Sequence, residues 1–211
     1  MFNANNNTIN TKSIKLSKCG VLIRYIYHKI MEDEEIKRLV FYHTMNPLDE
    51  KGLNYDGKLI DQPNTNQGQV KDYIFDLPFN PAIKIEKENS LYINLVRGAF
   101  YNNTNKITID INIVCSAEFL RLNTGYRHME ISQKIADLFD GMRVDKGEDG
   151  SFYDVLYNSK FDLTNFETIR LSNTSDYVWS RLTFEVTTSY GSRGWFYEVI
   201  QRLYYFGNHP E

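Results

Sequence analysis

The strongest constraint on the fold is the segment 106–119, KITIDINIVCSAEF, in which apolar and polar residues alternate. Successive side chains of a β-strand point to opposite faces, so this alternation predicts a strand with one buried face. The residues on the apolar side are Ile107, Ile109, Ile111, Ile113 and Cys115. The residues on the other side are Thr108, Asp110, Asn112 and Ser116, with Val114 as the exception. That second side is expected to meet water or a partner.

Further strands and helices follow from the same kind of pattern. Strands are predicted at 81–85, 91–96, 166–172 and 178–188, the last with a clear alternation. Helices are predicted at 17–30, from Asp33 towards Pro47, at 126–139 and at 195–206. The resulting order is helix, helix, long loop, three strands, helix, two strands, helix. It predicts an α+β fold, with a mostly antiparallel sheet flanked by helices in a single domain.

Local signals support two of these helices. Asp33 is expected to cap the second helix, and the acidic residues after it suit the positive end of the helix dipole. The acidic run MEDEE is therefore interpreted as a helix start and not as a metal site. In the helix 126–139, Ile131, Ile135, Leu138 and Phe139 are expected to be buried. Glu130 and Lys134 are spaced for an ion pair, and Gly141 suits a C-terminal cap.

The predicted domain organisation has one domain with extensions. Residues 1–16 form a polar, Asn-rich arm, and residues 17–211 form the domain. The segment 46–80 contains six Gly and Pro residues and no periodicity, so a long loop is predicted there. Its short apolar piece at residues 73–75 is expected to attach this loop to the domain. The loop is interpreted as a grip on a neighbouring subunit or as a ligand loop.

Composition narrows the function classes. The net charge is −3, which gives no support to a dedicated nucleic-acid-binding protein. The longest apolar runs are far shorter than the roughly 20 residues of a membrane helix, and the N-terminus has no apolar stretch typical of a secretory signal. The two cysteines, Cys19 and Cys115, lie far apart without a metal-binding spacing, so two buried thiols are expected.

No diagnostic catalytic motif is present, and we expect neither enzyme activity, a cofactor nor a metal site. The sequence lacks the glycine spacing of a phosphate loop and the HExxH zinc motif. The enzymatic alternative is a metal-dependent nuclease, which needs two or three carboxylates close together. The carboxylates considered for it are Asp110, Glu118 and Glu130, or Glu86 and Glu88 beside Lys87. Their local spacing fits such a site poorly.

The C-terminal helix 195–206 is rich in aromatic residues. These aromatic residues are Trp195, Phe196, Tyr197, Tyr204, Tyr205 and Phe206. They exceed what one helix face can bury, so a docking role for Trp195, Phe196, Tyr204 and Tyr205 is predicted. The alternative is a helix that is buried on two sides. Asp110 is added to the predicted partner interface, as a solvated or subunit-facing residue.

The segment 106–190 resembles the tail-terminator and neck proteins of tailed bacteriophages. The likeness rests on the strand KITIDINIVCSAEF, the helix YRHMEISQKIADLFDG and the strand DYVWSRLTFEVTTSY, in that order. It implies a small α+β domain that forms a ring, commonly of six copies, capping the tail tube at the head–tail junction. The loop 46–80, the Asn-rich arm and the aromatic helix 195–206 depart from this pattern.

From this resemblance we predict a structural protein of the virion, with the tail terminator as the first choice. The alternatives are a head-completion or connector protein, or another tail accessory protein. The expected partners are further copies of the chain and the adjacent neck and tail tube proteins. Double-stranded DNA is expected to pass through the ring without sequence-specific binding, and no membrane is involved. A binding module unrelated to phages, using the loop 46–80, is the remaining alternative.

Overall fold

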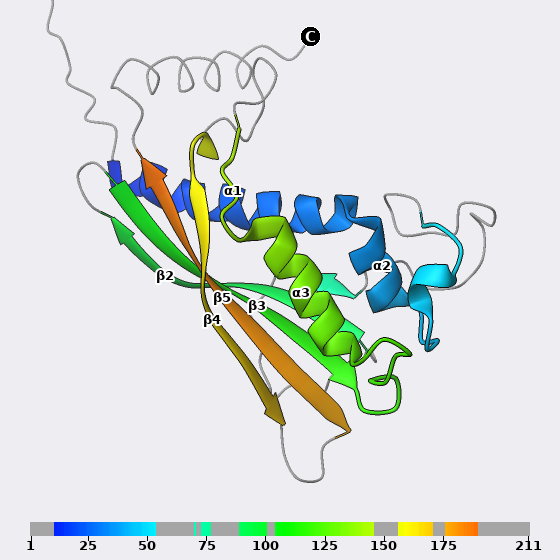
Figure 1. Ribbon diagram of the computed structural model, residues 1–211. Coiled ribbons are helices and arrows are strands. Elements are labelled where there is room, and N and C mark those ends of the chain that lie inside the picture. The colour runs from blue at the N-terminus through cyan, green and yellow to red at the C-terminus, as the bar shows by residue number, and fades with distance from the viewer. Residues whose placement is uncertain are drawn as a thin grey trace, which may run out of the picture.

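The computed structural model of the 211-residue chain describes residues 11–53, 70, 73–76, 89–100, 104–145, 156–170 and 176–189. Its helices are α1 (Thr11–Glu32), α2 (Glu34–Phe41), α3 (Arg127–Phe139) and the short 3-10 helix η1 (Pro47–Asp49). Its strands are β1 (Ile74–Phe75), β2 (Asn89–Phe100), β3 (Thr104–Ser116), β4 (Lys160–Arg170) and β5 (Tyr177–Ser189). The α-helices pack on one face of a twisted sheet (Figure 1). The predicted α+β fold is thus confirmed.

The five strands form one sheet in the order β1-β2-β3-β5-β4. β2, β3, β5 and β4 pair antiparallel, and only the short β1 joins β2 in the parallel sense. The chain therefore passes from β3 through α3 to the edge strand β4 and returns as β5 between them. This order confirms a mostly antiparallel sheet.

The centre of the sheet is β3, the strand that the alternation at 106–119 predicts. Its isoleucines at positions 107, 109, 111 and 113 are fully buried and belong to the core beneath the helices. Its other side is also shielded from water, because Asp110, Asn112 and Ser116 are only 7%, 2% and 7% exposed. Of the two expectations for this side, water is therefore wrong for these three residues, and contact with a partner stays a prediction. Both cysteines are free and buried, as predicted.

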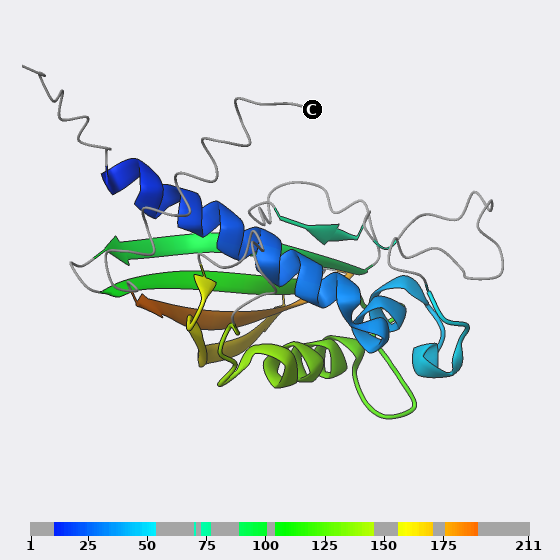
Figure 2. The same ribbon diagram turned by 90° about the horizontal axis from the view of Figure 1, so that it is seen from above.

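Three helices complete the core, each placed by an amphipathic stripe. α1 covers the sheet with Leu22, Ile26 and Ile30, and α3 covers it with Ile131 and Ile135 (Figure 2). α1 begins at Thr11, so the last part of the segment 1–16, predicted as a polar arm, is helical. Within the described part of the chain, no helix is long and apolar enough to cross a membrane.

The caps of the short helices agree with the sequence signals. The side chain of Asp33 accepts a hydrogen bond from the Ile36 N–H at 2.9 Å and so caps α2. Gly141 follows α3 with a φ of 75°, a conformation that glycine adopts without strain. Lys134 of α3 pairs with Glu35 of α2, so this lysine joins two helices. The sequence predicts instead a pair with Glu130 on its own helix.

The long segment 46–80 is only partly described. Tyr73 and Ile74 are buried, and β1 attaches this part to β2 through the pair Ile74↔Leu91. The prediction that the apolar piece 73–75 attaches the loop is confirmed. The strand predicted at 81–85 and the helix predicted at 195–206 lie outside the described residues.

Candidate interaction face

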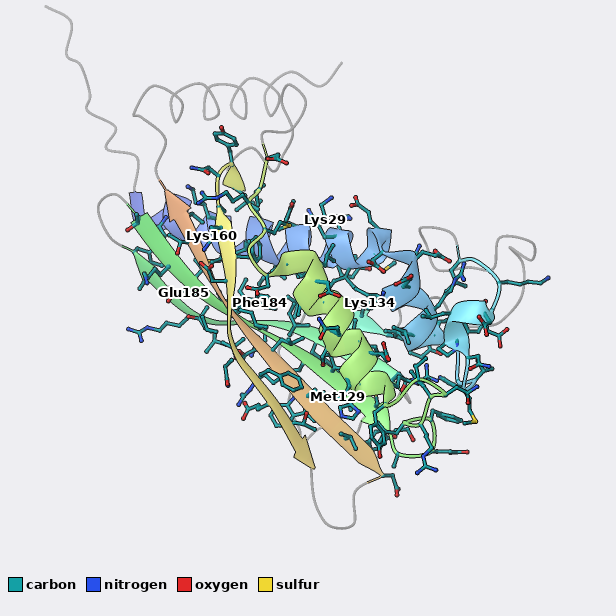
Figure 3. The ribbon with its side chains drawn as sticks, in the orientation of Figure 1. Lys29, Met129, Lys134, Lys160, Phe184 and Glu185 are labelled. Atoms are coloured by element: carbon teal, nitrogen blue, oxygen red, sulfur yellow. The ribbon has the colours of Figure 1, made fainter. Side chains whose placement is uncertain are left out.

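The face of the sheet opposite the helices carries the one predicted interface residue that the structure describes. We call the side chains of β2 to β5 that point away from α1 and α3 the outer face. No described helix lies on this face. Figure 3 shows the two sides of β5, with Phe184 towards α3 and Glu185 on the outer face. The register places the following residues on it: Asn94, Thr108, Asp110, Asn112, Val114, Glu167, Trp179, Arg181, Thr183 and Glu185.

Asp110 lies near the middle of this face and is held by β5. Thr183, directly across from it, donates a hydrogen bond from Oγ1 to Asp110 Oδ1 at 2.7 Å. Arg181 approaches the second carboxylate oxygen, with 3.6 Å between Nη1 and Oδ2. The side chain of Asp110 is only 11% exposed. The expectation that Asp110 is solvated is therefore wrong, because its sheet neighbours cover it.

Arg181 joins three strands. Its guanidinium pairs with Glu167 of β4 as well as with Asp110 of β3. The same guanidinium lies 5.2 Å from the centroid of the Trp179 ring, within the range of a cation–π contact. Trp179 in turn donates a hydrogen bond from Nε1 to Asn112 Oδ1 at 2.9 Å. The result is a polar network that fixes the relative positions of β3, β5 and β4.

Two further cations of the outer face pair with carboxylates, whereas Arg97 of β2 is exposed on this face. Lys106 of β3 pairs with Glu185 of β5 at 2.8 Å, and Lys160 of β4 pairs with Asp162. A face whose cations mostly contact carboxylates of the same sheet offers little net field to a charged partner. Its chemistry suits contact with another polar protein surface rather than capture of an anion or a metal.

Of the carboxylates considered for a nuclease, Asp110, Glu118 and Glu130 are not brought together, whereas Glu86 and Glu88, with Lys87, lie outside the described residues. Asp110 lies on the outer face, whereas Glu130 belongs to α3 on the opposite side of the sheet. Glu118 lies in the turn after β3, and the strand from Asp110 to its end at Ser116 alone spans roughly 20 Å. Within the described residues, no group of three or more His, Cys, Asp or Glu side chains could hold a metal ion.

The other predicted interface residues, Trp195, Phe196, Tyr204 and Tyr205, lie outside the described residues. Their docking role stays a prediction, as does a subunit-facing role for Asp110. The alternation at 178–188 puts Arg181 and Trp179 on one side of that strand, but it does not identify their partners. The signal was incomplete because the partners lie on neighbouring strands, and register is set by the whole sheet.

A second cluster that sequence reasoning missed surrounds Arg127, which is fully buried at the start of α3. Its guanidinium donates four hydrogen bonds of 2.5 to 2.8 Å to backbone carbonyls of Leu39, Tyr42, Thr44 and Phe119. Burial lowers the pKa of this guanidinium from its ordinary value. Arg127 therefore joins the end of α2 and the turn after β3 to α3, which indicates a structural role.

Comparison with known proteins gives one family. The family model YomW matches residues 33–186, which is more than half of the chain. The match begins at the cap of α2 and extends into β5, so it includes the outer face and the Arg127 cluster. The name of the family is derived from phages and is like those of Bacillus prophage proteins, so it associates the family with phages. No curated protein matches the chain.

Proposed function

The chain belongs to the YomW family, and from this membership we propose that it is a ring-forming structural protein of a phage particle. The first choice within this class is the tail terminator, which caps the tail tube at the head–tail junction. A head-completion or connector protein, or another tail accessory protein, is the alternative position in the same particle. We propose no catalytic role and no cofactor.

The observation that supports this proposal best is the outer face of the sheet. A subunit of a ring needs surfaces that pack against other protein surfaces, and it does not need a catalytic site. The outer face carries a network of Asp110, Arg181, Glu167 and Trp179 that is held within the sheet. Its paired charges also suit a surface along which DNA moves without being retained, since retention requires unpaired cations against phosphates.

The ring is tested by the assembly state of the purified full chain. Light scattering after size exclusion and negative-stain images are expected to reveal a closed cyclic oligomer, with six copies as the number implied by the tail-terminator likeness. Monomers alone, from dilute to concentrated solution, would contradict the proposal. The images also report whether the assembly closes, which separates a ring from an open filament.

The position in the particle is tested by deleting the gene from an inducible phage. Loss of a tail cap leaves the end of the tube open, so unjoined tails of irregular length are expected. Loss of a head-completion protein leaves tails of normal length beside heads that release their DNA. Infectious particles in normal yield after the deletion would argue against any structural role in the virion.

A further inference from the structure

The sheet has two long edges whose backbone groups have no partner strand among the described residues. At one edge, β1 pairs only with Leu91 and Tyr92, so the stretch from Ile93 to Phe100 of β2 lies beyond it. At the other edge, β4 contacts the segment 140–144 only as far as Leu163. Unpaired strand edges readily accept another strand, so an edge of this kind points to a partner.

The two edges carry complementary side chains. Each presents one exposed large apolar residue, Val96 of β2 at 53% and Phe166 of β4 at 40%. The β2 edge adds the exposed cation Arg97, and the β4 edge adds Glu167, which is half-buried and also pairs with Arg181 of its own sheet. The register places both charged residues on the outer face, so they would share a face in a joined sheet.

The strand directions fit a second copy of the same chain. β2 and β5 run antiparallel to β3, and β4 runs antiparallel to β5, so β2 and β4 point in opposite directions. Copies related by rotation in a ring all point the same way along the ring axis. The β2 of one copy beside the β4 of its neighbour therefore continues the antiparallel alternation. Such a head-to-tail contact uses both edges and leaves no edge exposed in a closed ring.

We propose that the edge of β4 from Thr164 onwards pairs with the edge of β2 from Ile93 onwards in a second copy of the chain. This inference rests on the proposed ring assembly and names the surfaces that build it. The bulges at Leu163/Asn165 and Leu95/Arg97 bend the two edges and limit where the pairing starts. The alternative contact, β4 against β4 of a two-fold partner, leaves both β2 edges unused.

The first test places a charge on each edge in the full chain. Phe166→Lys and Val96→Lys alter exposed side chains, so the fold is retained while a lysine opposes strand addition. The concentration needed for assembly is expected to rise at least about tenfold in either variant, measured by light scattering. The matched control is Met129→Lys on α3, 44% exposed and away from both edges (Figure 3), which is expected to assemble normally.

The second test identifies which edges meet. Thr168→Cys on β4 and Val96→Cys on β2 are prepared separately and treated with a short bis-maleimide. A dimer-sized product is expected only when the two variants are mixed or combined in one chain. The native thiols of Cys19 and Cys115 are 4% and 0% exposed, so the unaltered protein serves as the background control.

The outcomes separate this inference from the proposed function. An oligomer that persists unchanged in both lysine variants overturns the β4–β2 contact and leaves the ring proposal standing. Cross-linking of Thr168→Cys with itself alone overturns the contact in favour of a two-fold β4–β4 pair. A wild-type chain that stays monomeric overturns both.

Discussion

At the residue scale, Arg127 is the side chain whose role is least expected from its position. A cation in the first turn of α3 meets the positive end of the helix dipole, which is unfavourable. The cost is offset because the same guanidinium meets the carbonyls at the C-terminal end of α2, where the dipole is negative. An arginine at the start of an amphipathic helix thus indicates that its guanidinium binds acceptor groups of another element.

Replacement of Arg127 is expected to destabilise the fold strongly. Arg127→Met leaves four backbone carbonyls without their donors, which predicts a loss of about 3–5 kcal/mol in the free energy of unfolding. Arg127→Lys keeps the charge with fewer donors and should lose about 2 kcal/mol. Urea denaturation measures both changes.

The control for this prediction is Arg121→Met, because Arg121 is exposed in the loop before α3. Its effect is expected to stay within about 0.5 kcal/mol. An Arg127→Met protein as stable as wild type would mean that water or other groups replace the guanidinium.

At the element scale, α2 shows how a short helix depends on its ends. It has only eight residues, too few to be stable alone, so its cap and its packing on the core decide whether it forms. Asp33 supplies the cap, and Ile36, Leu39 and Val40 supply the buried stripe. Pro47 was expected to end this helix, but α2 ends at Phe41, where Arg127 binds the last carbonyls.

Loss of the cap is expected to weaken α2 measurably. Asp33→Ala removes the acceptor for the Ile36 N–H and predicts a loss of about 1 kcal/mol in the free energy of unfolding. Asp33→Asn retains an acceptor and should cost less than half as much. Thermal unfolding followed by circular dichroism compares the two variants, and equal losses would show that charge rather than the hydrogen bond matters.

At the scale of the whole molecule, the sheet separates two environments. One face is closed by helices and is apolar, whereas the outer face is polar, and its Lys106 and Arg181 pair with carboxylates of neighbouring strands. Together with the net charge of −3, this pairing leaves little attraction for DNA.

The molecule is therefore expected not to retain DNA at physiological salt. In a mobility-shift assay, the wild-type chain should leave double-stranded DNA unshifted. A variant with Asp162→Lys, Glu167→Lys and Glu185→Lys frees the cations of the outer face, and it should bind in a salt-dependent manner. Tight binding by wild type that survives these changes would place a DNA site elsewhere in the chain.

The sequence alone determined the elements that depend on local chemistry. The alternation at 106–119 predicted β3, the stripe at 126–139 predicted α3, and Asp33 and Gly141 marked helix ends correctly. These features are readable because side-chain period and capping act within a few residues of the chain.

The tertiary structure decided which surfaces those elements share. It inserted β5 between β3 and β4, brought Arg181 to Asp110 and Glu167, and joined Lys134 to Glu35. It also buried Asp110, although the alternation of apolar and polar residues by itself assigns Asp110 to a side that faces water. Strand order and register are set by packing over the whole sheet, so residues far apart in the chain gain partners that no local pattern contains.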